Sequence, residues 1–324
     1  MEHLLKLNNN AMRHSFGKFM FMLCVCSMAT IHFATHAATP DVTQPQVDKP
    51  ARVLFVGNSY FYYNNSLHNH VRRMVGAHNA ELDKRIQYKS ATIGGASLDH
   101  HNMDWLTMPG KIGVKEPFEL VILAGNSGDA LKESSRAKFA QTVAEHNKVI
   151  VSRGGKTALY MTPAYVPPHK ELNPQNMRKI EDMYVTVAND NQALVIPVGL
   201  AFEEAYRRYP DMKLHDKEDG SHPSPLGTYL AASTVVASVY GISPVGNAYS
   251  MFMAIDPQTA LQLQQVAQDV VNKFFGRKWN TLIAINNIAI QAINTLDTGQ
   301  FDAKEDGNYE AYNLTGVKTW ISNG

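Results

Sequence analysis

Short apolar runs alternate with amphipathic stretches through most of this chain. Mainly apolar runs of strand length lie at 51–57, 118–126, 156–163 and 193–199, and 86–94 is a further strand candidate that ends at a glycine. Stretches with the spacing of amphipathic helices lie at 66–78, 134–154, 173–191, 200–210, 224–241 and 256–276. Strands that are apolar throughout and alternate with helices indicate a parallel sheet covered on both faces. The pattern therefore predicts an α/β fold with a five-stranded parallel sheet, and ligands in such folds bind beyond the carboxyl ends of the strands.

The two ends of the chain differ from this pattern. Lys6, Arg13 and Lys18 precede an apolar run that ends in small residues, which is typical of a secretory signal peptide over 1–38. An uncleaved membrane anchor is the alternative, although the run is short for a spanning helix. We expect a linker over 39–50, a folded domain over 51–280 and a C-terminal extension of unassigned role over 281–324. The expected location is periplasmic or secreted.

Composition narrows the chemistry. Hydrophobic residues make up 44% and charged residues 18%, and the formal net charge is +1. No overall field would attract nucleic acid or an anionic membrane, and we expect no stable membrane insertion after signal cleavage. The two cysteines, Cys24 and Cys26, both lie in the signal segment. The mature chain would then use no disulfide, no thiolate nucleophile and no cysteine-ligated zinc.

A small acidic and histidine-rich group offers the one candidate for a metal site. Its members are Asp99, His100, His101 and Asp104. Adjacent histidines point apart in a strand, and no second group has ligand spacing. We therefore predict neither a metal nor another cofactor.

The first strand leads to a candidate nucleophile. The run 53–57 ends in Gly57, and Ser59 follows two residues later. A serine hydroxyl needs a base, and the base needs an orienting partner. His222 follows Asp219 by three residues in a loop just ahead of the 224–241 helix, which lets the carboxylate turn back to the imidazole. By itself such a pair is common by chance, and an ordinary turn residue at position 219 is then the favoured interpretation.

Donors for an oxyanion are found after the second and third strands. Gly95 follows the second, where a glycine lets a backbone N–H approach a ligand closely. Asn126 follows the third and offers a side-chain amide. The alternatives stay open at this point: a plain turn at Gly95, a loop cap at Asn126, and donation by Ser127 or a backbone amide in its place.

Taken together, these four segments resemble the sequence blocks of the SGNH hydrolases, also called GDSL-type esterases and acylhydrolases. Ser59 lies in VLFVGNSY, which resembles the first block. Gly95 lies in IGGAS and Asn126 in LAGNSGD, which resemble the second and third. Asp219 and His222 lie in DGSHPSPLGTYLAA, which resembles the last. The resemblance extends over about 52–244.

Two positions depart from the usual blocks. Asn58 stands where many members have aspartate, as in a GNS-type subgroup, and this position is not part of the triad. In the third block Asn126 directly follows Gly125, and the acidic residue, Asp129, comes later than usual.

The resemblance implies a flavodoxin-like three-layer α/β/α fold and serine ester hydrolysis without a metal. By this resemblance Ser59 attacks the ester, His222 moves the proton and Asp219 orients His222. The N–H groups of Ser59 and Gly95, with Asn126, would bind the oxyanion.

Substrate choice depends on residues near these blocks. Tyr60 and Tyr62 follow the nucleophile, and His101 and Trp105 follow the oxyanion glycine. Aromatic side chains there can stack on sugar rings, or they can pack beneath the site loops. We expect an exported esterase that removes O-acetyl groups from a carbohydrate, with short-chain or lipid esters left open. The alternative is a catalytically decayed binding protein for carbohydrate or envelope components. The oligomeric state is left open.

Overall fold

The computed structural model describes residues 39–277 and two short strands further on, β6 (Tyr309–Tyr312) and β7 (Lys318–Ile321). These two strands pair antiparallel with each other. The predicted signal peptide over 1–38 and most of the predicted extension over 281–324 lie outside the described residues. Within the part that is described, no helix has both the length and the apolar character to cross a bilayer.

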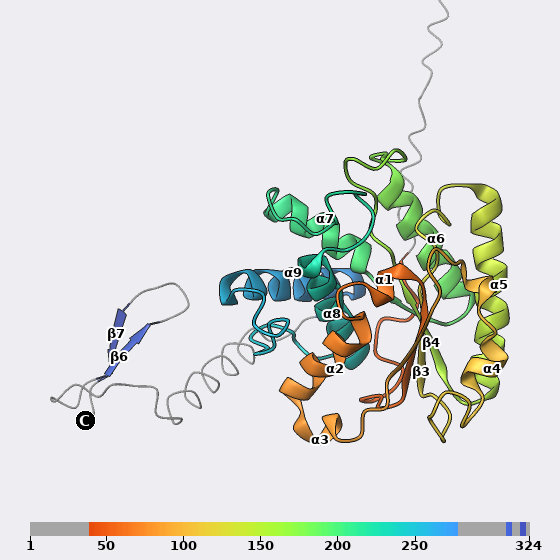
Figure 1. Ribbon diagram of the computed structural model, residues 1–324, viewed down its shortest axis with the longest axis horizontal. Coiled ribbons are helices and arrows are strands. Elements are labelled where there is room, and N and C mark those ends of the chain that lie inside the picture. Colours follow the sequence, from red (N-terminus) through yellow and green to blue (C-terminus); the bar gives the residue numbers. More distant parts are fainter. Residues whose placement is uncertain (1–38, 278–308, 313–317, 322–324) are drawn as a thin grey trace, which may run out of the picture. The chain divides into compact units, whose positions relative to one another are not determined.

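One sheet of five parallel strands organises the domain, as the sequence predicts (Figure 1). Its members are β1 (Val53–Gly57), β2 (Lys89–Thr92), β3 (Leu120–Leu123), β4 (Lys156–Tyr160) and β5 (Leu194–Ile196). They lie in the order β2-β1-β3-β4-β5, which is the flavodoxin-like order. The order reverses between β1 and β3. The loops after these two strands therefore border the crevice in which doubly wound folds bind ligands.

Helices cover both faces of the sheet, because successive strand residues point to opposite sides. In β1, Phe55 belongs to the core under one helical layer and Val56 to the core under the other. The first layer contains α2 (Leu67–His78), α7 (Val198–Arg208), α8 (Pro225–Tyr240) and α9 (Pro257–Phe275). The second contains α4 (Met103–Thr107), α5 (Glu133–Ser152) and α6 (Asn176–Asp190). The three-layer α/β/α fold is thus confirmed.

Capping residues set the ends of the buried helix α8. The Ser224 hydroxyl accepts a hydrogen bond from the Gly227 amide, and Pro225 occupies the first turn, where its missing N–H costs nothing. Gly241 ends the helix with φ of +60°, in the left-handed region that glycine adopts freely. The N-terminal cap lies immediately after the 219–222 loop and fixes where that loop meets the core.

Some boundaries differ from the prediction. The predicted strand 86–94 pairs only over Lys89–Thr92, and the predicted strand 193–199 ends at Ile196 because Pro197 leads directly into α7. Four short elements of the domain had no predicted counterpart, since they are too brief for a helical period to show: α1 (Ser59–Tyr62), α3 (Ala80–Asp83), the 3₁₀ turn η1 (Leu98–His100) and α4.

Candidate active site

The nucleophile candidate is held at the carboxyl end of β1. Ser59 is the first residue of α1 and is 7% exposed. Gly57 precedes it where space is short: a Cβ there would lie 3.0 Å from the Ala124 Cβ and 3.3 Å from the Ala124 carbonyl oxygen. Close approach of the β1 and β3 ends, rather than an unusual backbone conformation, therefore explains the glycine.

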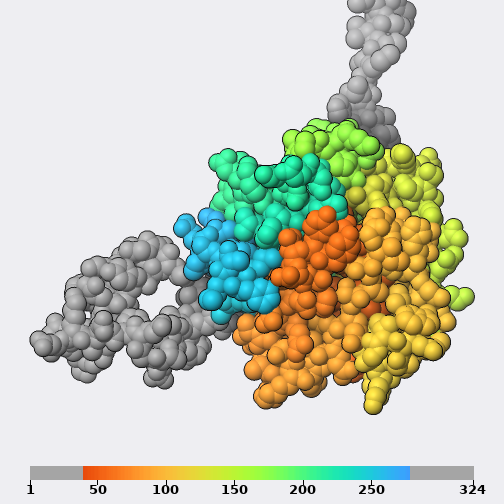
Figure 2. Space-filling view, viewed as in Figure 1, coloured from red at the N-terminus to blue at the C-terminus, as the bar shows by residue number. Residues whose placement is uncertain are grey.

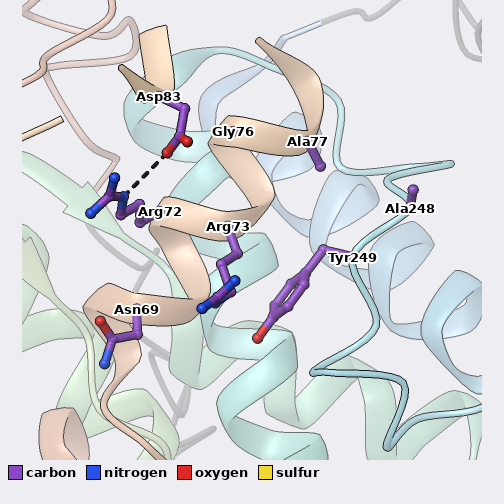
Figure 3. Close-up of a pocket in the computed structure, with 8 residues that line it drawn as sticks. All are labelled: Asn69, Arg72, Arg73, Gly76, Ala77, Asp83, Ala248 and Tyr249. Carbon is purple, nitrogen blue, oxygen red and sulfur yellow. Dashed lines mark hydrogen bonds and ion pairs between the residues drawn. The ribbon is translucent and has the colours of Figure 1, made fainter. Parts of the chain in front are cut away.

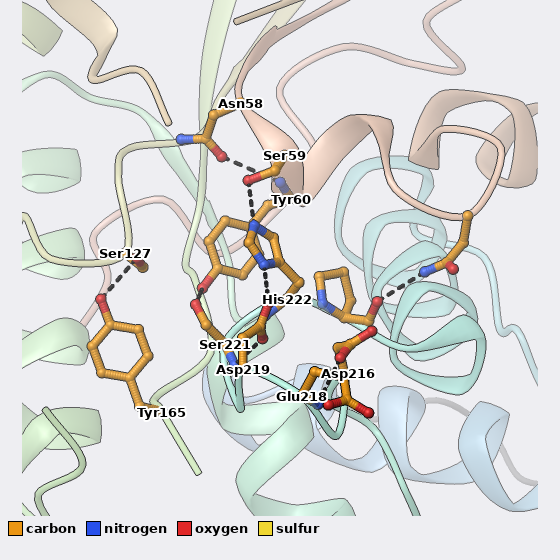
Figure 4. A network of polar contacts seen from close by, with 12 residues as sticks. Asn58, Ser59, Tyr60, Ser127, Tyr165, Asp216, Glu218, Asp219, Ser221 and His222 are labelled. Carbon is orange, nitrogen blue, oxygen red and sulfur yellow. Dashed lines mark hydrogen bonds and ion pairs between the residues drawn. The ribbon is translucent and has the colours of Figure 1, made fainter. Parts of the chain in front are cut away.

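Ser59 meets an imidazole from 163 positions later in the chain (Figure 4). The Ser59 Oγ lies 2.8 Å from His222 Nε2, and His222 Nδ1 lies 2.5 Å from Asp219 Oδ2. A carboxylate accepts, so Nδ1 carries the proton of the neutral ring and Nε2 is left to accept from the serine hydroxyl. This is the arrangement in which a base can deprotonate a serine.

The loop around Asp219 is braced from several directions. Asp219 Oδ1 accepts from the Ser221 amide at 2.7 Å and the His222 amide at 2.9 Å. Burial raises the pKa of this carboxyl, but hydrogen bonds from the His222 ring and these amides outweigh it, so the pKa is lowered overall. Gly220 has φ of +64°, and its carbonyl accepts from the Val166 amide at 2.9 Å.

Asn58 joins three loops of the site. Its side-chain Nδ2 donates to the carbonyls of Ala96 and Gly125, each at 3.0 Å, and its Oδ1 accepts from the Tyr60 amide at 3.2 Å. The residue is 2% exposed. An amide is the side chain that supplies two donors and an acceptor from one position, so asparagine matches these partners and an ionised aspartate does not.

The predicted oxyanion donors border this group. As the first residue of α1, Ser59 has an N–H without an acceptor inside the helix. Gly95 has φ of +68°, and a Cβ added there would meet nothing within 4 Å, so its backbone faces open space. Asn126 Nδ2 donates one hydrogen to the Gly95 carbonyl at 3.0 Å, which leaves its second hydrogen for another acceptor.

The unusual third block has a structural explanation in Asp129. Its Oδ2 accepts from the Asn126 amide at 2.7 Å, while Asn126 Oδ1 accepts from the Gly128 amide at 3.1 Å. Burial raises the pKa of Asp129 to about 6, although the Asn126 amide works against the rise. Asp129 thus stabilises the loop after β3 through a hydrogen bond to the Asn126 amide, and this loop holds Asn126 next to Gly95.

The four residues predicted to bind substrate fall in different places. Tyr62 is 41% exposed and remains at the surface beside the site. Tyr60 is buried, and its hydroxyl is hydrogen-bonded to that of Ser221 at 3.1 Å. His101 is also buried, and its Nε2 donates to the Gly57 carbonyl at 2.9 Å. Tyr60 and His101 therefore support the walls of the site instead of facing an incoming ligand.

Trp105 is not brought to this group. Its neighbour Asp104 pairs at 2.5 Å with Arg153, the residue that ends α5 on the side leading into β4. That pairing draws α4 along α5 and away from the carboxyl ends of the strands. Because Trp105 follows Gly95 closely in sequence, the prediction places it at the entrance to the site. The ion pair between Asp104 and Arg153 places α4 along the far end of α5 instead.

Two further residues support the site and were not among the predicted site residues: Tyr63 contacts the triad, and Asn64 contacts the chain just after His222. The ring of Tyr63 is stacked on that of His222, with centroids 4.3 Å apart and planes at 4°. Asn64 Nδ2 donates to the Pro223 carbonyl at 2.9 Å and to the Thr228 hydroxyl at 2.8 Å. In the sequence, only the run of aromatic residues after Ser59 points to the contact of Tyr63. No local sequence feature points to the contacts of Asn64.

The candidate site is accessible from the surface. The side chains of His222 and Asp219 are 26% and 39% exposed. On the face shown in Figure 2, the red-orange segment that follows β1 reaches the surface beside the teal segment of α7 and the loop after it. Within the residues that the structure describes, no group of three or more histidine, cysteine, aspartate or glutamate side chains is placed to hold a metal ion.

A separate hollow of about 590 Å³ lies along α2 (Figure 3). Arg72 and Arg73 line it, and both already have partners. Arg72 forms an ion pair with Asp83 at 3.2 Å, and the Arg73 guanidinium lies 4.6 Å from the centre of the Phe252 ring. Tyr249, on its wall, donates its hydroxyl to the buried His70. No member of the triad lines this hollow.

The fold and this geometry define a three-layer α/β/α protein with a Ser-His-Asp arrangement at its switch point. No protein-family model matches the chain, and no curated protein matches it. Among solved structures, a DUF4886 family protein from Bacteroides uniformis is similar at 19% identity and a TM-score of 0.51, over 68% of this chain and 93% of that one.

Two other solved structures are similar at lower TM-scores. One, from Slackia heliotrinireducens, is provisionally assigned to the SGNH hydrolases; it shares 20% identity over 58% of this chain and 98% of that one, with a TM-score of 0.46. The other is an acetyl xylan esterase, at 18% identity, the same shares of both chains and a TM-score of 0.46. The likeness to the DUF4886 family protein concerns the fold alone. The resemblance to the SGNH hydrolases and to a GNS-type subgroup stays a prediction from the sequence.

Proposed function

We propose that this protein is an exported serine esterase that hydrolyses carboxylic esters, with O-acetyl groups on a carbohydrate as its substrates. The observation that carries the proposal is the continuous contact from Ser59 through His222 to Asp219, at 2.8 and 2.5 Å. Export is inferred from the signal-like pattern over 1–38.

The proposal assigns one group to each step of ester hydrolysis. Ser59 Oγ attacks the carbonyl carbon while its proton passes to His222 Nε2, and Asp219 stabilises the imidazolium. The negative charge on the carbonyl oxygen is met by the N–H groups of Ser59 and Gly95 and the second hydrogen of Asn126. The imidazolium then protonates the leaving alcohol. Water, activated by the same ring, releases the acid from the acyl-enzyme.

The surroundings favour a short acyl group on a large alcohol. The triad is partly open to solvent, and the exposed ring of Tyr62 lies beside it, as a polymer chain or sugar ring would require. The Ser127 hydroxyl, which accepts from the Tyr165 hydroxyl near the triad, is only partly buried, and a long acyl chain lying against it would desolvate it at a cost.

The first experiment measures release of p-nitrophenol from p-nitrophenyl acetate by residues 39–324. We expect Ser59→Ala to lower kcat on the order of 10⁴–10⁶-fold. Ser152→Ala serves as the matched control, since this exposed serine ends α5 and its hydroxyl donates only to the Val149 carbonyl. Equal rates for Ser59→Ala and the unaltered chain would refute the esterase and leave a binding protein on the same fold.

The second experiment tests the substrate class. Acetate release from acetylated xylo-oligosaccharides is compared with hydrolysis of p-nitrophenyl butyrate and octanoate. We expect acetate release that Ser59→Ala abolishes, and a kcat/KM that falls as the acyl chain lengthens. A kcat/KM that rises toward octanoate, without acetate release, would replace the carbohydrate ester by a lipid ester.

A further inference from the structure

The base candidate is covered on one face by an aromatic ring. Tyr63 lies flat against His222, with ring centroids 4.3 Å apart and an angle of 4° between the planes. Tyr63 directly follows α1, and its amide donates to the Ser59 carbonyl at 3.2 Å. The segment that carries the nucleophile therefore also carries the ring that covers the base.

Stacking leaves the hydrogen-bonding edge of the imidazole free. Nε2 and Nδ1 lie in the plane of the ring and contact Ser59 and Asp219, whereas Tyr63 touches only its face. The Tyr60 ring lies further away, at 6.1 Å and 32°. Because a quarter of the His222 side chain is exposed, without Tyr63 the imidazole could rotate away from Ser59 into solvent.

The stack also acts on charge. The face of an aromatic ring is electron-rich and attracts a cation within about 6 Å of its centre. His222 is neutral before Ser59 is deprotonated and positive afterwards, so Tyr63 stabilises the second state more than the first. An interaction that strengthens toward the transition state raises kcat, and one that is equal in both states does not.

We propose that Tyr63 is a positioning residue for His222: its ring holds the imidazole between Ser59 and Asp219 and stabilises the imidazolium that forms during acyl transfer. This role rests on the proposed esterase activity. The titratable groups around the stack, all unchanged in the variants below, are Tyr60 and Tyr62 from α1 and Asp216 and Asp219 from the loop of His222.

The test is the pH dependence of kcat/KM for p-nitrophenyl acetate. Tyr63→Leu should lower kcat/KM about 2- to 30-fold and move the midpoint of the acidic limb about 0.4–1.5 pH units lower, because the imidazolium loses its partner. Tyr63→Phe keeps the ring and should restore both values. An unchanged midpoint in Tyr63→Leu would overturn the proposal, whether or not the rate falls.

A graded substitution protects the test against misfolding of Tyr63→Leu. Phenylalanine, 4-fluorophenylalanine and 3,4,5-trifluorophenylalanine at position 63 keep the ring in place while withdrawing electrons from its face. We expect the midpoint to move lower with each step of fluorination. A midpoint that stays constant along the series would overturn the proposal.

A readout independent of turnover separates this proposal from the esterase. The His222 imidazole resonance can be titrated by NMR in an inactive Ser59→Ala background, and it is assigned as the resonance that disappears in His222→Gln. Its midpoint should shift in the same order among the position-63 variants as the midpoint of kcat/KM does. Tyr206→Leu is the matched control, because it removes a ring that stacks at 9° on His215. Movement of the His222 midpoint in Tyr206→Leu as large as in Tyr63→Leu would overturn the assignment to Tyr63.

Discussion

Replacing Asn58 by aspartate tests the proposed architecture most directly, because it changes one atom of one side chain. The new carboxylate keeps the acceptor for the Tyr60 amide. Its second oxygen takes the place of the Nδ2 that now donates to the Ala96 and Gly125 carbonyls at 3.0 Å each. In an ionised aspartate that oxygen cannot donate, so two buried carbonyls lose their donor and face a negative charge.

The expected cost follows from the burial of Asn58. A buried acceptor left without a donor costs about 1–3 kcal/mol. The two carbonyls together therefore cost about 2–6 kcal/mol, a large share of the 5–15 kcal/mol that is typical of a folded domain. Burial raises the pKa of the introduced carboxyl, and its protonated form can donate to one of the carbonyls. The loss of stability should thus be smaller at low pH and grow as pH rises through the raised pKa.

Activity should fall together with stability. Ala96 follows Gly95 and Gly125 precedes Asn126, so both loops that carry predicted oxyanion donors lose their anchor. Displacement of one such donor typically lowers kcat about 10²–10³-fold. Denaturant unfolding at pH 5 and pH 8, with kcat/KM for p-nitrophenyl acetate, measures both effects.

The same substitution at a second asparagine provides the control. Asn102 is the exposed N-cap of α4, and its Oδ1 accepts from the Trp105 amide at 2.9 Å. Aspartate caps a helix as well as asparagine does, so Asn102→Asp should change little. The reasoning is refuted when Asn58→Asp matches the unaltered chain at pH 8, or when its loss of stability is the same at both pH values.

Two other predictions concern the loops that hold the site. A Cβ at Gly220 would lie 2.1 Å from the Val166 carbonyl oxygen, so Gly220→Ala should displace the base loop and lower kcat/KM about 100-fold, whereas Gly154→Ala, at φ of +81° in open space, should retain activity. Retained activity in Gly220→Ala would contradict the loop's role. Because burial raises the pKa of Asp129 to about 6, the native state favours its protonated form, and the stability that this contributes is lost as pH rises from about 4 through 6. Asp129→Asn, which can still accept from the Asn126 amide, should flatten the fall of Tm over this range, and an equally steep fall would contradict the assignment.

What the sequence predicts best is local. The apolar runs predict β1, β3, β4 and β5 because a parallel strand buried on both faces is apolar at nearly every position. The edge strand β2 is only half-buried and carries a weaker apolar signal. Ser224, Pro225 and Gly241 mark the ends of α8 because capping depends on a few adjacent residues. In the observed strand order β1 and β3 are neighbours, so the loops after them meet. Candidate site residues from separate sequence blocks therefore lie at the same edge of the sheet.

What the sequence does not predict depends on partners far along the chain. Asn58 looks like a neutral substitution until its two carbonyl partners, at 96 and 125, are known. Tyr63 is one of several neighbouring aromatic residues, and only the position of His222 distinguishes it from Tyr62. The placement of Trp105 depends on a distant partner in the same way. Trp105 follows Gly95 closely along the chain, but the ion pair between its neighbour Asp104 and Arg153 determines where α4 lies.

These partners converge on one short stretch, residues 58–63. Asn58 binds the loops after β2 and β3, Ser59 and Tyr63 contact the ring of the base, and Tyr60 contacts Ser221 in the loop of the base. The stretch begins at the end of a fully buried strand, so it is positioned by the core itself. Substitutions within it should therefore change stability and catalysis together. Tyr62 is the most exposed member of this stretch and forms no hydrogen bond to the buried loops that the structure describes, so changes there should affect substrate binding more than the unfolding transition.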